Sequence, residues 1–532
     1  MANKFISGTL ILTLSGFVVK AIGSINWIIL SRILGGEGIG IYQMAFPIYL
    51  LALDISSAGL PIAISIITAE KVAKQDYFGA QRIFHVSLSM LCTTALFLSI
   101  LMFFGSSFLI DEHIIRESRA YYSLIALAPA IFFTTIIAGY RGYLQGWQQM
   151  TPTAISQIVE QLVRVVVMLG FAALLLPYGL DYAAGGASLG AGAGGFAAWL
   201  VLVYYYYKLK RTLPVDGPTF EQESIKHILK RLVILAIPIS LSSIMLPVVS
   251  NLDLLIVPRR LEVAGYSTHQ ATELFGYLTG MSVPLINLAT ILTAAMAMSL
   301  VPAISHSFTL KEYDEIRERT ATSMRISFLV TIPFSVILYV MAEPIVTFIY
   351  NAPAATDATR AVAIAICFLG LHQISTAILQ GLKKPKIPVI NMAVACVAKV
   401  LCNWFLVAIP TLGITGASYA TVADIGVAAV LNMFFIYRKI GYVIDIKVVM
   451  KNIVSAAIMG VAMYFMYAFL FPYLGLFLDL FLTCIVGSAI YIGCMVLNGG
   501  VTKEDAAKMP LEKTRCLCDS AFFSGQRLAV SR

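Results

Sequence analysis

Apolar runs of about 20 residues follow one another almost from end to end of this chain of 532 residues. A helix rises about 1.5 Å per residue, so each run matches the roughly 30 Å hydrocarbon core of a bilayer. Hydrophobic residues make up 59% of the chain and charged residues only 12%, with a mean hydropathy of +0.86, which is too apolar for a soluble domain. The sequence therefore predicts an all-α integral membrane protein.

Hydropathy predicts about fourteen transmembrane helices. The first run carries Lys20 in its middle and lacks a small-residue cleavage site, so we interpret it as a retained helix and not as a signal peptide. The predicted spans lie near residues 8–34, 41–68, 83–110, 119–142, 153–176, 183–207, 232–257, 274–303, 326–350, 359–381, 388–410, 414–437, 452–471 and 474–497.

Basic residues concentrate in alternate loops. With the N-terminus in the cytoplasm, the loops on that side hold most of the Lys and Arg residues, and the opposite loops hold only Arg32, Arg116, Arg119, Arg259, Arg260 and Arg360. By the positive-inside rule this bias predicts a multi-pass protein of the cytoplasmic membrane with both termini inside. It also accounts for most of the net charge of +9 without a nucleic-acid partner.

Short motifs recur in the two halves of the sequence. Leu144-Gln145-Gly146 has a counterpart in Leu379-Gln380-Gly381, and the stretch 59–65 resembles 299–305. Six spans per half with the same orientation predict a parallel repeat, in which two bundles surround a midplane site. The predicted domains are an N-terminal six-helix bundle (1–210), a cytoplasmic linker (211–231), a C-terminal six-helix bundle (232–440), two additional transmembrane helices (441–498) and a cytoplasmic tail (499–532).

Ionisable residues within the predicted spans are the candidate functional residues, because a charge in lipid costs several kcal/mol unless it faces a cavity or a partner. Three cations facing one cavity would suit a phosphate-bearing ligand. Glu160 and Arg164 are spaced i, i+4, so a self-neutralised structural pair is the alternative there. The cations are Lys20, Arg164 and Lys399, and the acids are Asp54, Glu160, Asp253 and Asp424.

The parallel repeat makes transport the leading class of function. No nucleotide-binding motif is present in the sequence, so transport would be driven by the membrane potential or by a Na+ or H+ gradient. The four acids are the predicted ion or proton carriers. The eight cysteines form no metal or disulfide framework, although Cys516 and Cys518 form a C-x-C pair near the C-terminus. The glycine-rich run 185–195 has no strand before it, so it predicts close helix packing and not a dinucleotide loop. We expect no catalytic residue, no cofactor and no resident metal.

Several runs resemble the stage V sporulation protein B group of bacterial polysaccharide exporters, which are relatives of the lipid II flippases in the superfamily that includes multidrug extruders. The runs are Ser31-Arg32-Ile33-Leu34-Gly35 leading to Gly38, Gly40 and Tyr42; Gly59 to Ser65 with Ala69-Glu70; Tyr277-Leu278-Thr279-Gly280; and Ser299 to Ser305. They cover both halves of the chain.

The resemblance implies a flippase that moves a polyprenyl-pyrophosphate-linked oligosaccharide, expected to be a peptidoglycan precursor, across the membrane, with spore cortex synthesis as its setting. Lys20 matches a basic cavity position of the lipid II flippases. A second basic position falls near Asn26 and Trp27 here. The missing charge would then come from other candidates, which are Arg32, Arg164, Arg259, Arg260 and Lys399.

Two other classes of function remain open at this point. The first is a multidrug/cation antiporter of the same superfamily. The second is a membrane scaffold or enzyme of cell-wall polysaccharide assembly, although the external loops are short for an enzyme site. The expected partners are the lipid-linked oligosaccharide, membrane lipids and cell-wall synthases.

Overall fold

The computed structural model describes residues 2–57, 59–213 and 223–499. Within these ranges the chain is helical and contains no strand, so the all-α prediction is confirmed. The predicted tail from residue 500 onward, with Cys516 and Cys518, and residues 214–222 of the predicted linker lie outside the described residues.

The chain forms two compact units. Unit 1 comprises Met1–Met281, Ile349–Ala355 and Val400–Ala417, and unit 2 comprises the remaining residues from Ser282 onward. These units differ from the predicted sequence halves, because α7 (Ile225–Val263) and α8 (Thr268–Gly276) group with the first six helices. The division into domains at residues 210, 231, 440 and 498 stays a prediction.

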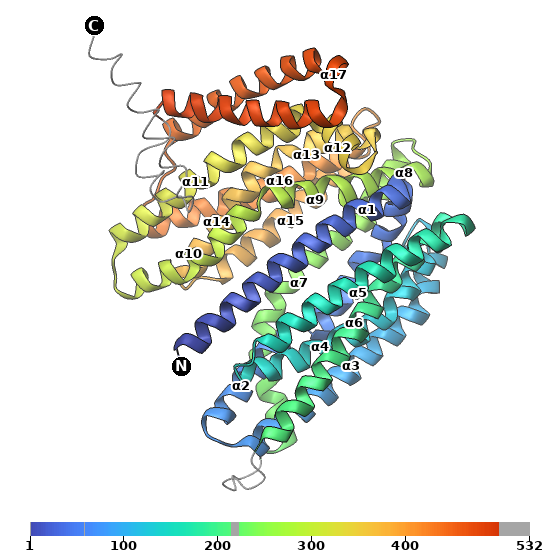
Figure 1. Ribbon diagram of the computed structural model, residues 1–532, viewed down its shortest axis with the longest axis vertical. Coiled ribbons are helices and arrows are strands. Elements are labelled where there is room, and N and C mark those ends of the chain that lie inside the picture. The colour runs from blue at the N-terminus through green and yellow to red at the C-terminus, as the bar shows by residue number, and fades with distance from the viewer. Residues whose placement is uncertain (1, 58, 214–222, 500–532) are drawn as a thin grey trace. The chain divides into compact units, whose positions relative to one another are not determined.

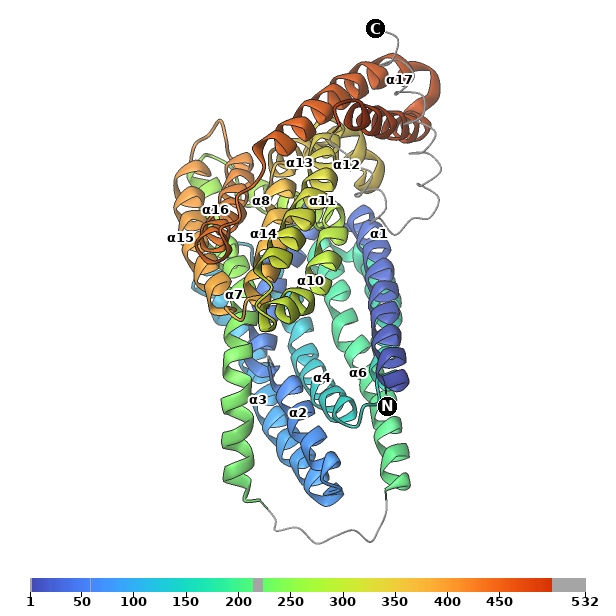
Figure 2. The same ribbon diagram turned by 90° about the vertical axis from the view of Figure 1, so that its left-hand side faces the viewer.

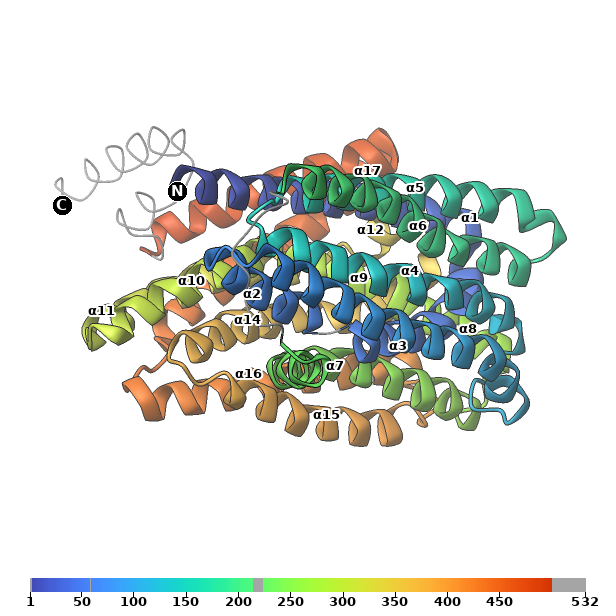
Figure 3. The same cartoon turned by 90° about the horizontal axis from the view of Figure 1, so that it is seen from below.

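The helices of unit 1 pack side by side (Figures 1 and 3). An aromatic core made by Phe84, Tyr140, Tyr143 and Tyr206 joins α3, α4 and α6, with ring centroids 4.5–5.9 Å apart. The helices are α1 (Ala2–Ser57), α2 (Leu60–Ala73), α3 (Tyr77–Asp111), η1 (Ser118–Ala120), α4 (Tyr121–Gly146), α5 (Thr151–Leu175), η2 (Leu176–Tyr178), α6 (Leu180–Thr212), α7 (Ile225–Val263) and α8 (Thr268–Gly276).

Local sequence signals set several helix boundaries in unit 1. Asp76 caps α3 by accepting a 2.8 Å hydrogen bond from the Gly79 amide, and Ser267 and Gln270 form a capping box at the start of α8. Gly35 breaks the helical geometry inside α1, with φ 66° and ψ −174°. That conformation favours glycine, and it separates the predicted spans at 8–34 and 41–68.

Unit 2 begins inside the π-helical turn η3 (Tyr277–Ser282). Its last helix bends at Gly475 (φ 70°) and turns back on itself, as Figures 1 and 2 show. The Tyr491 hydroxyl on the second leg donates to Asn452 Oδ1 on the first leg at 2.6 Å. The helices that follow η3 are α9 (Val283–Ala289), α10 (Ile291–Thr309), α11 (Tyr313–Val340), α12 (Ala342–Tyr350), η4 (Pro353–Ala355), α13 (Thr356–Ala363), α14 (Ala365–Gly381), α15 (Lys386–Leu406), α16 (Ile414–Ile440) and α17 (Ile446–Leu497).

Many of these helices can span a bilayer. Among the described residues, 11 are long and apolar enough, or 12 if the bent pair Pro353–Ala363 and Ala365–Gly381 forms one span. The first of the 11, Val18–Ala73, covers most of two predicted spans, and α7 is not counted although it contains the predicted span 232–257. The chain is therefore a multi-pass membrane protein, and the number of about fourteen spans stays a prediction.

Candidate functional site

Three charged side chains meet between α4 and α5 in unit 1. Both carboxylate oxygens of Glu160 contact guanidinium groups: Arg164 Nη2 lies 2.6 Å from Oε1, and Arg141 Nη2 lies 2.8 Å from Oε2. Arg141 Nε also donates to Ser156 Oγ at 3.0 Å. We call Arg141, Glu160 and Arg164 the arginine cluster. Two positive charges and one negative charge leave one positive charge in excess.

The i, i+4 pair of Glu160 and Arg164 forms, as its spacing allowed, but Arg141 shares the same carboxylate. Glu160 and Arg164 alone would be neutral, but with Arg141 the three side chains carry a net charge of one positive unit. The side chain of Arg164 is 28% exposed, and its Nε is buried with no hydrogen-bond partner among the described residues. An unsatisfied buried donor costs about 1–3 kcal/mol, and because this N–H has almost no exposed surface, an acceptor can reach it only if neighbouring side chains move.

Glycines of α6 bring it directly against the backbone of α5. A Cβ atom at Gly194 would stand 2.6 Å from the carbonyl oxygen of Glu160, and one at Gly190 would stand 2.7 Å from that of Arg164. Small residues allow two helices to approach this closely, as the run 185–195 predicts. The same glycines therefore set the position of the α5 segment that carries the arginine cluster.

We expect Gly194→Ala to lower the free energy of unfolding by about 1–3 kcal/mol, because its methyl group would overlap backbone that cannot rotate away. Thermal unfolding in detergent micelles measures the effect. Gly170→Ala on α5 is the matched control, because no atom lies within 4 Å of its added Cβ. That control should be neutral or stabilising, since alanine favours helix by about 1 kcal/mol over glycine. Equal unfolding temperatures for the two variants would contradict this account.

The predicted site residues of α1 lie along α5. Asn26 Nδ2 contacts Met168 Sδ at 3.0 Å, and Asn26 Oδ1 is buried without a hydrogen-bond partner in the part of the chain that the structure describes. A Cβ at Gly23 would lie 3.2 Å from Gln161 Nε2. Lys20, about two turns before Asn26, is exposed and makes no ion pair or hydrogen bond within the described ranges. Lys20 thus remains an uncompensated cation on the helix that packs against α5.

The acidic candidates differ in their surroundings. Asp54 on α1 is half-buried and has no hydrogen bond or ion pair to any described residue. Asp253 on α7 accepts a 2.8 Å hydrogen bond from Asn403 Nδ2 in unit 1. In unit 2, Asp424 lies 3.7 Å from Lys399 Nζ, with the two side chains 12% and 9% exposed. Lys399 thus has a buried acidic neighbour that its sequence position did not reveal.

The three remaining cationic candidates bind backbone oxygens in unit 1. Arg32 Nε donates to the carbonyl of Ile349 at 2.8 Å, and Arg259 Nη2 donates to that of His113 at 3.1 Å. Arg260 Nε donates to the carbonyl of Trp404 at 2.8 Å, and its guanidinium lies 4.5 Å from the centroid of the Trp404 ring. The carbonyl groups that Arg259 and Arg260 contact are neutral and do not compensate the charges of these two arginines. Their role in substrate binding stays a prediction.

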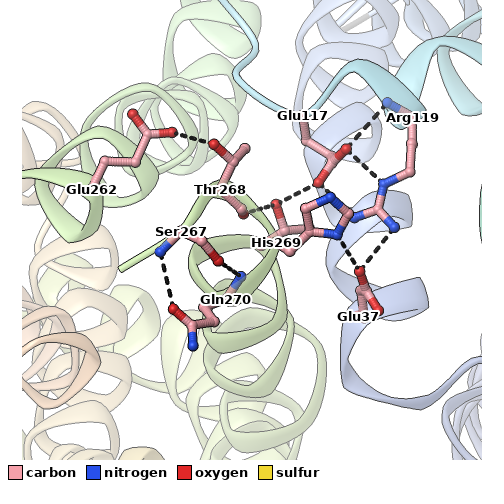
Figure 4. A network of polar contacts seen from close by, with 9 residues as sticks. Glu37, Glu117, Arg119, Glu262, Ser267, Thr268, His269 and Gln270 are labelled. Atoms are coloured by element: carbon pink, nitrogen blue, oxygen red, sulfur yellow. Dashed lines mark hydrogen bonds and ion pairs between the residues drawn. The ribbon is translucent and has the colours of Figure 1, made fainter. Parts of the chain in front are cut away.

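A second network joins α1, η1 and α8 near the kink at Gly35 (Figure 4). Glu37 Oε1 contacts Arg119 Nη1 at 2.8 Å and His269 Nδ1 at 2.9 Å. Glu117 Oε2 accepts from Arg119 Nη2 at 2.8 Å and from the Thr272 hydroxyl at 3.0 Å. Burial raises the pKa of Glu117, but its bonds to Arg119 prevail and hold that pKa below its ordinary value. The network ties three separate segments together.

Arg141 is the site residue that the sequence analysis missed. It lies inside the predicted span 119–142, three residues before Leu144-Gln145-Gly146, so the rule that selected the other ionisable residues could have found it. Asn403 was missed because a neutral amide gives no charge signal. Among the described residues, no group of three His, Cys, Asp or Glu side chains could hold a metal ion.

The family model described as "Polysaccharide biosynthesis protein" matches residues 5–308, and one described as "MatE" matches residues 238–405. Stage V sporulation protein B of Bacillus subtilis (strain 168) is 30% identical over 447 residues, which cover 84% of this chain and 86% of that protein. Lipid II flippase MurJ of the same strain is 26% identical over 543 residues, with 96% and 98% covered.

Solved structures share the fold. "Lipid II flippase MurJ, inward closed conformation" aligns with a TM-score of 0.69 at 15% identity and covers 92% of this chain and 98% of that one. An inward-facing multidrug resistance MATE family transporter aligns with a TM-score of 0.64 at 16% identity, with 82% and 98% covered. The resemblance inferred from the sequence motifs is confirmed, and the chain belongs to the polysaccharide biosynthesis protein family of membrane transporters.

Proposed function

We propose that this protein is a flippase that moves a polyprenyl-pyrophosphate-linked oligosaccharide, a peptidoglycan precursor, outward across the cytoplasmic membrane by alternating access. Its relatives include a lipid II flippase and a sporulation protein that each match more than four fifths of the chain. They are not enzymes, and the head group of such a substrate is too polar to cross hydrocarbon unaided. A protein path is therefore the physical requirement of this cargo.

The observation that carries the proposal is the arginine cluster. A pyrophosphate presents several anionic oxygens, and guanidinium groups bind such oxygens through charge-assisted hydrogen bonds. The side chain of Arg164 is 28% exposed, and Arg141 and Arg164 together carry one more charge than Glu160 neutralises. Lys20 adds an uncompensated cation on α1, which packs along the same helix.

The remaining predicted residues extend the proposal. Arg32, Arg259, Arg260 and Lys399 are further cations for the head group. Asp54, Glu160, Asp253 and Asp424 are the proposed carriers of the coupling Na+ or H+, or respond to the membrane potential. Both termini are proposed to lie in the cytoplasm, and cell-wall synthases are the proposed protein partners. The match to stage V sporulation protein B supports a role in spore cortex synthesis.

A multidrug/cation antiporter is the second candidate, because a MatE model matches residues 238–405 and a MATE transporter shares the fold. The two functions require opposite site chemistry. A cationic drug would be repelled by the excess positive charge of the arginine cluster, whereas a pyrophosphate would be attracted. The cluster therefore favours the lipid-linked substrate.

Reconstitution of the purified protein in vesicles tests the two candidates side by side. Fluorescent lipid II on the inner leaflet should become accessible to an external reagent faster than in protein-free vesicles. The same vesicles, with Na+ or pH gradients imposed in turn, should show no accumulation of ethidium. Ethidium transport without movement of lipid II would assign the chain to the antiporter class. Movement of neither substrate, together with complementation of a null mutant, would favour the scaffold.

A further inference from the structure

A pocket of about 420 Å³ lies at one end of unit 1, where α3 ends and α4 and α6 begin. Ser107 and Asp111 line it from α3, Ser118 from η1, Tyr122 from α4 and Asp181 from α6. The segments around it, 111–118 and 176–183, belong to the loops that the charge bias places outside the cell. No residue of the arginine cluster lines this pocket.

The polar groups of the pocket are unused. Asp111, Asp181 and the side chains of Ser107 and Ser118 make no hydrogen bond or ion pair to any described residue. Arg119 at the same pocket differs, because its guanidinium is occupied by Glu37 and Glu117. Two carboxylates and two hydroxyls therefore face the pocket with free acceptor and donor capacity.

Tyr121 and Tyr122 complete the lining, and Tyr182, which does not line the pocket, stacks on Tyr122. The rings of Tyr122 and Tyr182 stack with centroids 4.6 Å apart and an interplanar angle of 30°, and the Tyr122 hydroxyl donates to that of Tyr182 at 3.3 Å. These side chains are 39% and 41% exposed. Stacking with Tyr182 uses one face of the Tyr122 ring, and the exposed part of that ring leaves apolar surface beside the free carboxylates.

This combination suits neither a calcium ion nor an anion. A Ca2+ ion takes about six to eight oxygen ligands, and only two carboxylates are present, with the Arg119 guanidinium beside them. The two carboxylates in turn repel anions. A neutral ligand that offers many hydroxyl donors and an apolar face suits the pocket, and a sugar ring has both.

We propose that this pocket binds a saccharide, with Asp111 and Asp181 accepting hydrogen bonds from sugar hydroxyls and Tyr122 packing against a ring face. The inference rests on the proposed function, since an exported oligosaccharide head would emerge at this end of unit 1. It adds a second recognition site that acts on the sugar and not on the pyrophosphate. Binding there would hold the released head group and oppose its return.

The test uses the full-length protein in lipid nanodiscs and a soluble β-1,4-linked N-acetylglucosamine tetramer as the probe. Saturation-transfer NMR should detect binding to the wild type. The double variant Asp111→Asn, Asp181→Asn should bind at least about 10-fold more weakly, because charge-assisted hydrogen bonds become neutral ones. Tyr122→Leu should weaken binding to a similar extent. Asp314→Asn and Tyr204→Leu, exposed residues outside the pocket, are the matched controls and should bind as the wild type does.

Several results would overturn the proposal: no tetramer binding by the wild type, equal binding by the pocket variants, or Ca2+ or choline displacing the tetramer from the pocket. Vesicle flipping of lipid II, measured on the same preparations, separates this proposal from the proposed function. A protein that flips lipid II but does not bind the tetramer refutes only the saccharide pocket. A protein that binds the tetramer through these residues but does not flip lipid II refutes only the flippase.

Discussion

Replacing Arg164 with glutamine is expected to reduce lipid II flipping in vesicles about 10-fold to 100-fold, because a hydrogen bond to a charged group contributes about 1.5–3 kcal/mol and each 1.4 kcal/mol is a factor of ten. Glutamine keeps a polar side chain, but it is shorter and uncharged, so the positive charge and the two Nη donors of the guanidinium are removed. The substrate would thereby lose the charge-assisted contacts that the partly exposed Arg164 guanidinium can make. Initial rates at several lipid II concentrations measure the effect.

A second arginine provides a matched control. Arg319 contacts Glu315 at 2.6 Å and i, i+4 spacing, the same geometry as Arg164 and Glu160, but its side chain is 44% exposed on α11. Exposed pairs contribute about 0.2–1 kcal/mol, so Arg319→Gln should change flipping less than about 2-fold. Equal losses in the two variants would show that any i, i+4 pair matters to the fold and that Arg164 has no special role in transport.

Glu160→Gln separates substrate binding from packing within the same cluster. Without its carboxylate, Arg141 and Arg164 lose their common counter-ion, so the substrate-free protein should be less stable. Added inorganic pyrophosphate should then raise the unfolding temperature more in this variant than in the wild type, because it replaces the lost anion. An identical response to pyrophosphate in both proteins would argue against an anion site at the arginine cluster.

Breaking the buried pair in unit 2 is expected to have the largest effect on stability. Lys399→Met leaves Asp424 without its cation, and Asp424→Leu leaves Lys399 without its anion, in surroundings where the two side chains are 9% and 12% exposed. Removing one partner of a buried ion pair destabilises by about 3–5 kcal/mol. Each single variant should therefore unfold at a markedly lower temperature in detergent.

The double variant Lys399→Met, Asp424→Leu decides whether the pair has a functional role. Replacing both charges by apolar side chains of similar volume is often neutral for stability, so the double variant should recover most of the lost stability. If Asp424 carries the coupling ion or Lys399 binds the head group, flipping should stay impaired despite this recovery. Recovery of both stability and flipping would assign the pair a purely structural role.

Part of the candidate site could be predicted from local patterns in the sequence. Ionisable residues stand out against apolar spans, and the four-residue spacing of Glu160 and Arg164 places both on one helix face before any fold is known. The glycine-rich run 185–195 likewise predicted close packing, since side-chain size is read directly from sequence. The Glu160–Arg164 contact depends only on residues within one turn of the same helix. The close packing depends only on the small size of the residues in the run 185–195.

Contacts between helices could not be predicted from such local patterns. Arg141 shares the Glu160 carboxylate from 19 positions away, Asn403 reaches Asp253 across 150 positions, and His269 contacts Glu37 across 232 positions. Each contact depends on how far a helix is rotated about its axis and how deep it sits against its neighbour. Single-sequence periodicity carries little information about either quantity when almost every position is apolar.

The sequence by itself determined the solvent of this protein and its class: long apolar runs require lipid, the loop charges predict an orientation, and the motifs identify the family. Tertiary structure alone decided which charges compensate one another, pairing Lys399 with Asp424 and leaving an excess positive charge around Glu160. The reason is that hydropathy is a property of each residue added along the chain, whereas electrostatic compensation is a property of distances between side chains that only packing of the helices creates.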